Sequence, residues 1–153
     1  MTKTPGYERY SYEYFMNEAL KEAQKALERN EVPIGAIVVC QNRIIARAHN
    51  LSEALTDVTA HAEMQAITAA SDHLGGKYLN ECTLYVTLEP CIMCAGAIFW
   101  AQLEKLVYGA DDKKRGYRLI RQQILHPKTE VESGILQHEC STLITTFFKN
   151  KRR

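Results

Sequence analysis

The chain has 153 residues, of which 46% are hydrophobic and 24% are charged, and these ordinary globular values predict one domain over residues 1–153. The formal net charge of +1 excludes a bulk electrostatic field that would attract nucleic acid, so any such binding must come from local basic patches. No apolar run is long enough to span a bilayer, and the N-terminal stretch MTKTPGYERYSYEYF lacks the apolar segment of a secretory signal. We therefore expect a cytoplasmic protein.

The first half of the chain predicts a helix followed by a hairpin. Apolar residues recur at helical spacing through 12–28, and Ser11 is a suitable N-cap. Residues 34–40, IGAIVVC, have the composition of a buried strand. The dipeptide QN at 41–42 would turn the chain into a second strand, RIIARAH (43–49), which predicts an antiparallel hairpin.

The second half alternates helices and strands. The pattern predicts a helix from about Ala60 to Ser71, a strand at 83–87, a helix at 91–101, a strand at 105–109, a short fifth strand within 129–136 and a closing helix at 138–150. Crossovers of this length imply parallel pairing. The predicted fold class is therefore α/β, a three-layer α/β/α arrangement around a mixed five-stranded sheet, in which an antiparallel hairpin is joined to a parallel βαβαβ unit.

Two polar motifs follow predicted strands, TAHAE at 59–63 and EPCIMC at 89–94. Ligands of open α/β sheets lie outside the carboxyl ends of the strands, so we expect His61 and Cys91 at the same rim of the sheet. Cys91 and Cys94 are three residues apart and share one face of a helix, in a first turn that favours thiolates. Two thiolates and one imidazole form a donor set that suits zinc.

The number of these ligands favours catalysis. A structural zinc takes four protein ligands, whereas three ligands and an open position predict a catalytic site in which bound water has a pKa of about 7. Glu63 is the natural proton carrier, provided that His61 reaches off the end of its helix while Glu63 points across the pocket, because residues two apart do not share a helix face. The alternative is a zinc-stabilised binding domain that is not an enzyme, with Cys82 as the fourth ligand.

The order His61-Ala62-Glu63, then Pro90-Cys91-Ile92-Met93-Cys94, matches the H-x-E, P-C-x-x-C signature of zinc-dependent nucleobase deaminases. The chain also resembles the bacterial tRNA adenosine deaminases of the cytidine-deaminase-like superfamily over nearly its whole length. The matching segments are VPIGAIVV (32–39), TAHAEMQAI (59–67), TLYVTLEPCIMCAGAI (83–98), VYGADD (107–112), SGIL (133–136) and TTFFKNKRR (145–153).

This resemblance implies hydrolysis of adenosine to inosine at the wobble position of a tRNA anticodon loop, by a homodimer that binds one Zn²⁺ per subunit and a flipped-out base. It implies that His61, Cys91 and Cys94 ligate the zinc and that Glu63 shuttles the proton. It also implies that Asn50 and Asp112 bind the target nucleotide or its neighbour. With the resemblance, we expect the basic run at 113–115, the pair Arg118 and Arg121, and the basic run at 149–153 to contact RNA.

Several alternatives stay open at this point. Residues 96–101, GAIFWA, resemble guanine deaminases, so a deaminase of a free base or nucleoside such as guanine or cytosine is the second candidate function. Asn50 is also a typical strand-end turn residue. Glu89 is interpreted as a structural carboxylate, and His126, in an exposed loop, is a further candidate for RNA contact.

Overall fold

The computed structural model describes residues 6–151. The elements of this part of the chain are α1 (Tyr12–Glu28), β1 (Gly35–Cys40), β2 (Arg43–His49), α2 (Ala62–Leu74), β3 (Cys82–Leu88), α3 (Ile92–Ala101), β4 (Lys105–Ala110), the short 3-10 helix η1 (Tyr117–Leu119), β5 (Glu130–Glu132) and α4 (Gln137–Lys151). The order of helices and strands predicted from the sequence is confirmed. None of the helices described is long and apolar enough to cross a membrane.

The five strands form one mixed sheet in the order β2-β1-β3-β4-β5. β1 pairs antiparallel with both β2 and β3, whereas β3, β4 and β5 are mutually parallel, as the prediction for the second half required. Two features depart from a simple βαβαβ unit: β5 is joined to β4 through the short helix η1 instead of an α-helix, and β1 lies between β2 and β3. This position fits the sequence, because GAIVVC is apolar on both faces, whereas β2 exposes Arg43 and Arg47 as an edge strand can.

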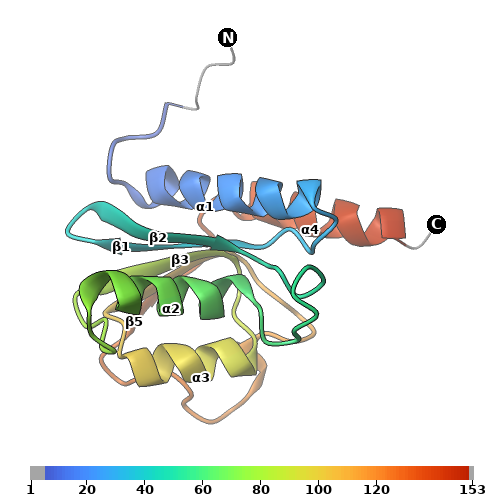
Figure 1. Ribbon diagram of the computed structural model, residues 1–153. Helices are drawn as coiled ribbons and strands as arrows, with labels where there is room; N and C mark the ends of the chain where they lie inside the picture. The colour runs from blue at the N-terminus through green and yellow to red at the C-terminus, as the bar shows by residue number, and fades with distance from the viewer. Residues whose placement is uncertain (1–5, 152–153) are drawn as a thin grey trace.

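Helices cover both faces of the sheet, which confirms the predicted three-layer α/β/α architecture (Figure 1). α1 and α4 lie on one face, and α2 and α3 lie on the other. The first face contains the buried side chains Phe15, Met16, Ile37, Tyr85 and Val107. The second contains Ala62, Ala66, Leu84, Ile98 and Tyr108. Burial of these apolar surfaces on both sides provides most of the driving force for this arrangement.

Local signals fix most element ends where the sequence places them. The hydroxyl of Ser11 accepts a hydrogen bond from the amide of Tyr14 at 3.1 Å and caps α1, as predicted. Gln41 and Asn42 have φ values of 52° and 61°, the left-handed conformation that a tight two-residue hairpin turn requires.

The predicted bounds of α2, about Ala60 to Ser71, were wrong at both ends. The helix begins two residues later because His61 is its N-cap, with an extended backbone. It continues to Leu74 and ends where Gly75 adopts φ 68°, a left-handed conformation open to glycine. The late start is what frees the His61 side chain from the helix.

The N-termini of α2 and α3 both begin at the rim where β2 and β3 end, and the two helices pack against each other. His61 is the N-cap of α2, and Cys91 is the N-cap of α3. The fold therefore places both predicted metal motifs at one rim of the sheet, at the amino ends of two neighbouring helices.

α1 lies close against the sheet at Gly35. A Cβ atom at this position would collide with the backbone of Ala19 and Ala23. We expect Gly35→Ala to reduce the free energy of unfolding by about 3 kcal/mol, because backbone atoms cannot yield as a side chain can. Gly76→Ala, whose new Cβ meets nothing within 4 Å, should change it by less than about 0.5 kcal/mol. Urea unfolding of both variants checks this, and equal stabilities would contradict it.

Candidate active site

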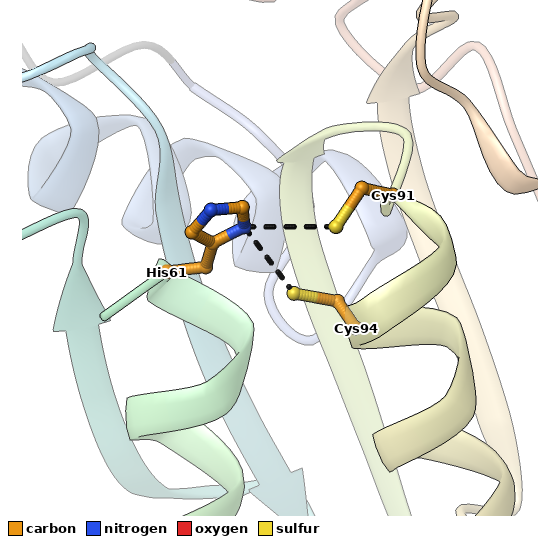
Figure 2. Close-up of side chains that lie close together, drawn as sticks. All are labelled: His61, Cys91 and Cys94. Carbon is orange, nitrogen blue, oxygen red and sulfur yellow. Dashed lines mark hydrogen bonds between the residues drawn. The ribbon is translucent and has the colours of Figure 1, made fainter. Parts of the chain in front are cut away.

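Three side chains from the two helix N-termini converge on one point (Figure 2). Nδ1 of His61 lies 3.6 Å from Sγ of Cys91 and 3.6 Å from Sγ of Cys94. All three donor atoms lie within 4.8 Å of one another. We refer to His61, Cys91 and Cys94 as the ligand cluster.

The spacing of the ligand cluster fits zinc. Tetrahedral coordination with a Zn–S bond of about 2.3 Å and a Zn–N bond of about 2.0–2.1 Å places nitrogen and sulfur about 3.6 Å apart. Both His61–Cys distances have this value. The imidazole and two sulfurs are also the donors that zinc prefers, so the donor set and the distances agree.

The cluster also has the electrostatics of a cation site. The hydrogen bond from Cys94, and then the one from His61, lowers the pKa of the Cys91 thiol well below its ordinary value. The Cys94 thiol behaves in the opposite way. The hydrogen bond between Cys94 and Cys91, together with burial, raises the pKa of Cys94, so this thiol keeps its proton. Two thiolates this close repel each other unless a positive charge lies between them. A divalent cation supplies that charge, and its binding releases the remaining proton.

Glu63 lies in the first turn of α2 and is only 4% exposed. Its carboxylate faces the Cys94 thiol, and burial raises its pKa to about 7. The geometric condition set by the sequence is met for His61, whose extended backbone (φ −72°, ψ 155°) carries it off the helix end. A carboxyl group of near-neutral pKa beside a metal site can both accept and donate a proton at physiological pH.

The structure contradicts the alternative in which Cys82 completes a structural zinc site. Cys82 begins β3, at the opposite end of that strand from Cys91, and its register partner is Cys40 of β1. Burial, together with Cys40, raises the pKa of the Cys82 thiol to about 12, the direction expected for an inert buried cysteine. Among residues 6–151, the only group of metal-ligating side chains close enough to share an ion is the ligand cluster.

Comparison with known proteins identifies the family. The family model for the cytidine and deoxycytidylate deaminase zinc-binding region matches residues 9–110. The tRNA-specific adenosine deaminase of Bacillus subtilis (strain 168) is 47% identical over 146 residues, which are 92% of this chain and 91% of the relative. The chain belongs to the tRNA adenosine deaminases of this zinc-dependent family.

Solved structures of deaminases share the fold. One, from studies of A-to-I editing by tRNA:A34 deaminases at the wobble position of transfer RNA, has a TM-score of 0.80 and 46% sequence identity, over 85% of this chain and 98% of that one. Guanine deaminase from Bacillus subtilis has a TM-score of 0.63 and 38% identity, over 66% of this chain and 65% of that one. The likeness to the first structure is therefore higher in both measures and extends over much more of the molecule.

Asn50 lies beside the ligand cluster in this deaminase fold. It is buried directly after β2, and its Oδ1 accepts a hydrogen bond from the amide of Ser52 at 3.4 Å. The next residue, Leu51, donates its amide to the carbonyl of Ala60, which immediately precedes His61. Asn50 is thus a strand-end turn residue adjoining the site, and its role in binding a nucleotide stays a prediction.

Asp112 follows β4 and organises its own loop. Its Oδ1 accepts hydrogen bonds from the amides of Lys114 and Arg115, each at 3.0 Å. His126, the other loop candidate, accepts from the amide of Lys128 and lies 5.9 Å from the Phe99 ring. Contact of either residue with RNA stays a prediction. Of the basic run at 149–153, Arg152 and Arg153 lie outside the described residues.

Sequence reasoning missed one buried carboxylate beside the site. Glu31 is fully buried and accepts hydrogen bonds from the amides of Glu53 and Ala54, at 3.0 Å and 2.7 Å, in the loop between β2 and α2. The sequence did contain one indication of this role: Glu31 directly precedes the apolar stretch VPIGAIVV. A carboxylate buried beside such a stretch needs hydrogen-bond donors. The hydrogen-bond partners of Glu31 could not be predicted from the sequence, because they are backbone amides, which every residue except proline carries.

The ligand cluster generates a prediction on metal content. We expect Cys91→Ser and Cys94→Ser each to abolish retention of zinc, because removal of one thiolate leaves two protein ligands and an uncompensated positive charge. Cys82→Ser should keep one zinc per chain, since Cys82 lies away from the cluster. Metal analysis of the three purified variants checks this. Loss of zinc from Cys82→Ser, or full retention in Cys94→Ser, would contradict it.

Proposed function

We propose that this chain is a zinc-dependent tRNA adenosine deaminase, one deaminase domain over 1–153 that converts adenosine to inosine at the wobble position of an anticodon loop. The observation that carries the proposal is the buried Glu63 facing a ligand cluster of zinc spacing, in a chain of the tRNA adenosine deaminase family. The overall reaction consumes water and releases ammonia, so it requires no redox cofactor.

We assign His61, Cys91 and Cys94 to the zinc and Glu63 to proton transfer. Zinc bound there supplies a Lewis acid and lowers the pKa of an attacking water. Glu63 accepts the proton of that water and delivers it to N1 of the adenine ring, which makes C6 electrophilic. The hydroxyl of the water then adds to C6. The same carboxyl group moves the proton of this new C6 hydroxyl to the amino group, so the C6–N bond breaks, ammonia leaves and the carbonyl of inosine forms. Burial suits Glu63 to both steps because it brings the pKa close to 7.

Asn50 and Asp112 are proposed to hold the target nucleotide or its neighbour after the base has flipped out of the loop. Exposed basic side chains on the stretch that begins at Asp112 support RNA binding, since they can pair with phosphates. These side chains are Lys113, Lys114, Arg115, Arg118 and Arg121. The charge is local, which agrees with the small net charge of the whole chain.

We further propose that the enzyme acts as a homodimer in the cytoplasm, where tRNA is found. The support for a dimer is the apolar surface of α3, on which Ile92 is 54% exposed and Trp100 is 75% exposed. α3 lies at the outside of its layer (Figure 1), so this surface is accessible to a second copy. Large exposed apolar side chains on one helix favour an interface.

The first test uses an anticodon stem-loop RNA with adenosine at the wobble position. Zinc-loaded protein should convert that adenosine to inosine, detectable by nuclease digestion and mass spectrometry of the nucleosides. The rate should fall steeply as salt is raised, because phosphate contacts release counterions. The matched control is the same stem-loop with adenosine only at another loop position. Absence of inosine from the first RNA would overturn the proposed substrate.

A deaminase of free guanine is the second candidate function, favoured by the GAIFWA segment and the fold shared with guanine deaminase. It would release ammonia from free guanine with little dependence on salt, since a neutral base brings no phosphates. Guanine, cytosine and adenosine assayed in parallel with the stem-loop separate the two functions. Ammonia from guanine without inosine in the RNA would favour the second.

Glu63 provides the test of mechanism. We expect Glu63→Ala to reduce kcat about 10³-fold while keeping zinc, because it removes the proton carrier and none of the three ligands. Glu22→Ala, which removes a buried carboxylate on the opposite side of the sheet, should retain activity. Single-turnover rates and metal analysis on the same preparations check this. A Glu63→Ala protein with more than about a tenth of wild-type kcat would rule out the assigned role.

A further inference from the structure

Glu89 is a buried carboxylate immediately before the Pro90-Cys91 motif, and both of its oxygens are used. It is 5% exposed. Its Oε1 accepts a hydrogen bond from the amide of Asp112 at 3.1 Å, and its Oε2 accepts one from the amide of Arg118 at 3.0 Å. The carboxylate thus spans the two ends of the segment 111–118, which we refer to as loop 111–118.

Backbone contacts bring this loop onto the ligand cluster. The amide of Tyr117 donates to the carbonyl of Pro90 at 2.9 Å, and Gly116 forms an isolated antiparallel bridge with Cys91. Glycine is required at 116 because a Cβ atom would collide with the Glu89 carboxylate. The loop is therefore packed against a zinc ligand on one side and against Glu89 on the other.

A carboxylate is well suited to this task. It offers acceptors only, so two N–H groups can converge on it, and hydrogen bonds to an ionised acceptor are stronger than neutral ones. Because Glu89 is buried, a carboxylate oxygen without a hydrogen-bond donor would destabilise the fold, so both loop amides must stay in place. Loop 111–118 therefore has one favoured position relative to Cys91.

We propose that Glu89 is a positioning residue for substrate: its buried carboxylate fixes loop 111–118 against Cys91 and so sets where the side chains of this loop lie relative to the ligand cluster. This inference rests on the proposed deaminase function. The loop carries Asp112, Arg115 and Arg118, the side chains offered to the nucleotide and its phosphates. Glu89 itself touches neither substrate nor metal, so its effect is on binding rather than on proton transfer.

The test is Glu89→Gln, which keeps size and shape. Glutamine has one acceptor oxygen, so one loop amide faces an NH₂ group instead. We expect KM to rise roughly tenfold, the factor for loss of one charge-assisted hydrogen bond, with kcat and zinc content unchanged. The amides of Asp112 and Arg118 should also exchange hydrogen faster. KM is measured with whichever substrate the wild-type chain deaminates, stem-loop or guanine, so failure of the proposed function leaves this test intact.

A second variant approaches the same contact from the other side. Gly116→Ala should raise KM in the same way, and the double variant should be no worse than the poorer single variant, because both displace one loop. The control is Glu22→Gln, which should leave KM unchanged. Glu22 is also a buried carboxylate, but it pairs with Lys25 on α1. Unchanged KM in Glu89→Gln, or loss of zinc from this variant, overturns the proposal.

Discussion

The convergence of two helix N-termini is the constraint on which the rest of the site depends. His61 and Cys91 are both N-caps with extended backbone, so each side chain leaves its helix at the end where unpaired N–H groups and the positive pole of the helix dipole lie. That environment favours thiolates but opposes a cation. Two thiolates resolve the conflict, because together they neutralise a divalent ion that would otherwise sit against two positive helix ends.

Three buried glutamates lie in or contact the segments next to the metal motifs, and their partners give them different tasks. Glu31 and Glu89 each accept hydrogen bonds from two backbone amides, so Glu31 holds the connection between β2 and α2 and Glu89 holds loop 111–118. Glu63 instead faces the thiol of Cys94, and burial raises its pKa to about 7. One side-chain type thus provides two anchors for loops and one group that faces the ligand cluster.

The sequence predicted the features that depend on residues close together in the chain. Ser11 and the helical periodicity gave α1, the dipeptide at 41–42 gave the hairpin, and the metal motifs gave the ligand cluster with Glu63. It could not predict that β1 lies between β2 and β3, because strand order depends on long-range pairing. Nor could it predict the loop anchors, since Glu31 and Glu89 bind amides 22 to 29 residues away that leave no side-chain signature.

The residues proposed for the reaction and the loops proposed for substrate binding belong to different parts of the fold. This division indicates how one fold can serve different substrates. The ligand cluster and Glu63 belong to the amino ends of α2 and α3, whose inner residues are part of the buried core, whereas Asn50 and Asp112 belong to the connections after β2 and β4. Loops can vary without loss of the core, so the choice between an RNA nucleotide and a free base is expected to lie in them. The carboxylates that hold these loops are Glu31 and Glu89. Glu31 binds the loop that leads to His61, and Glu89 immediately precedes the Pro90-Cys91 motif. A change of substrate that altered these loops would therefore have to preserve the carboxylates that hold them, because otherwise loop 111–118 and Cys91 would no longer keep a fixed spacing.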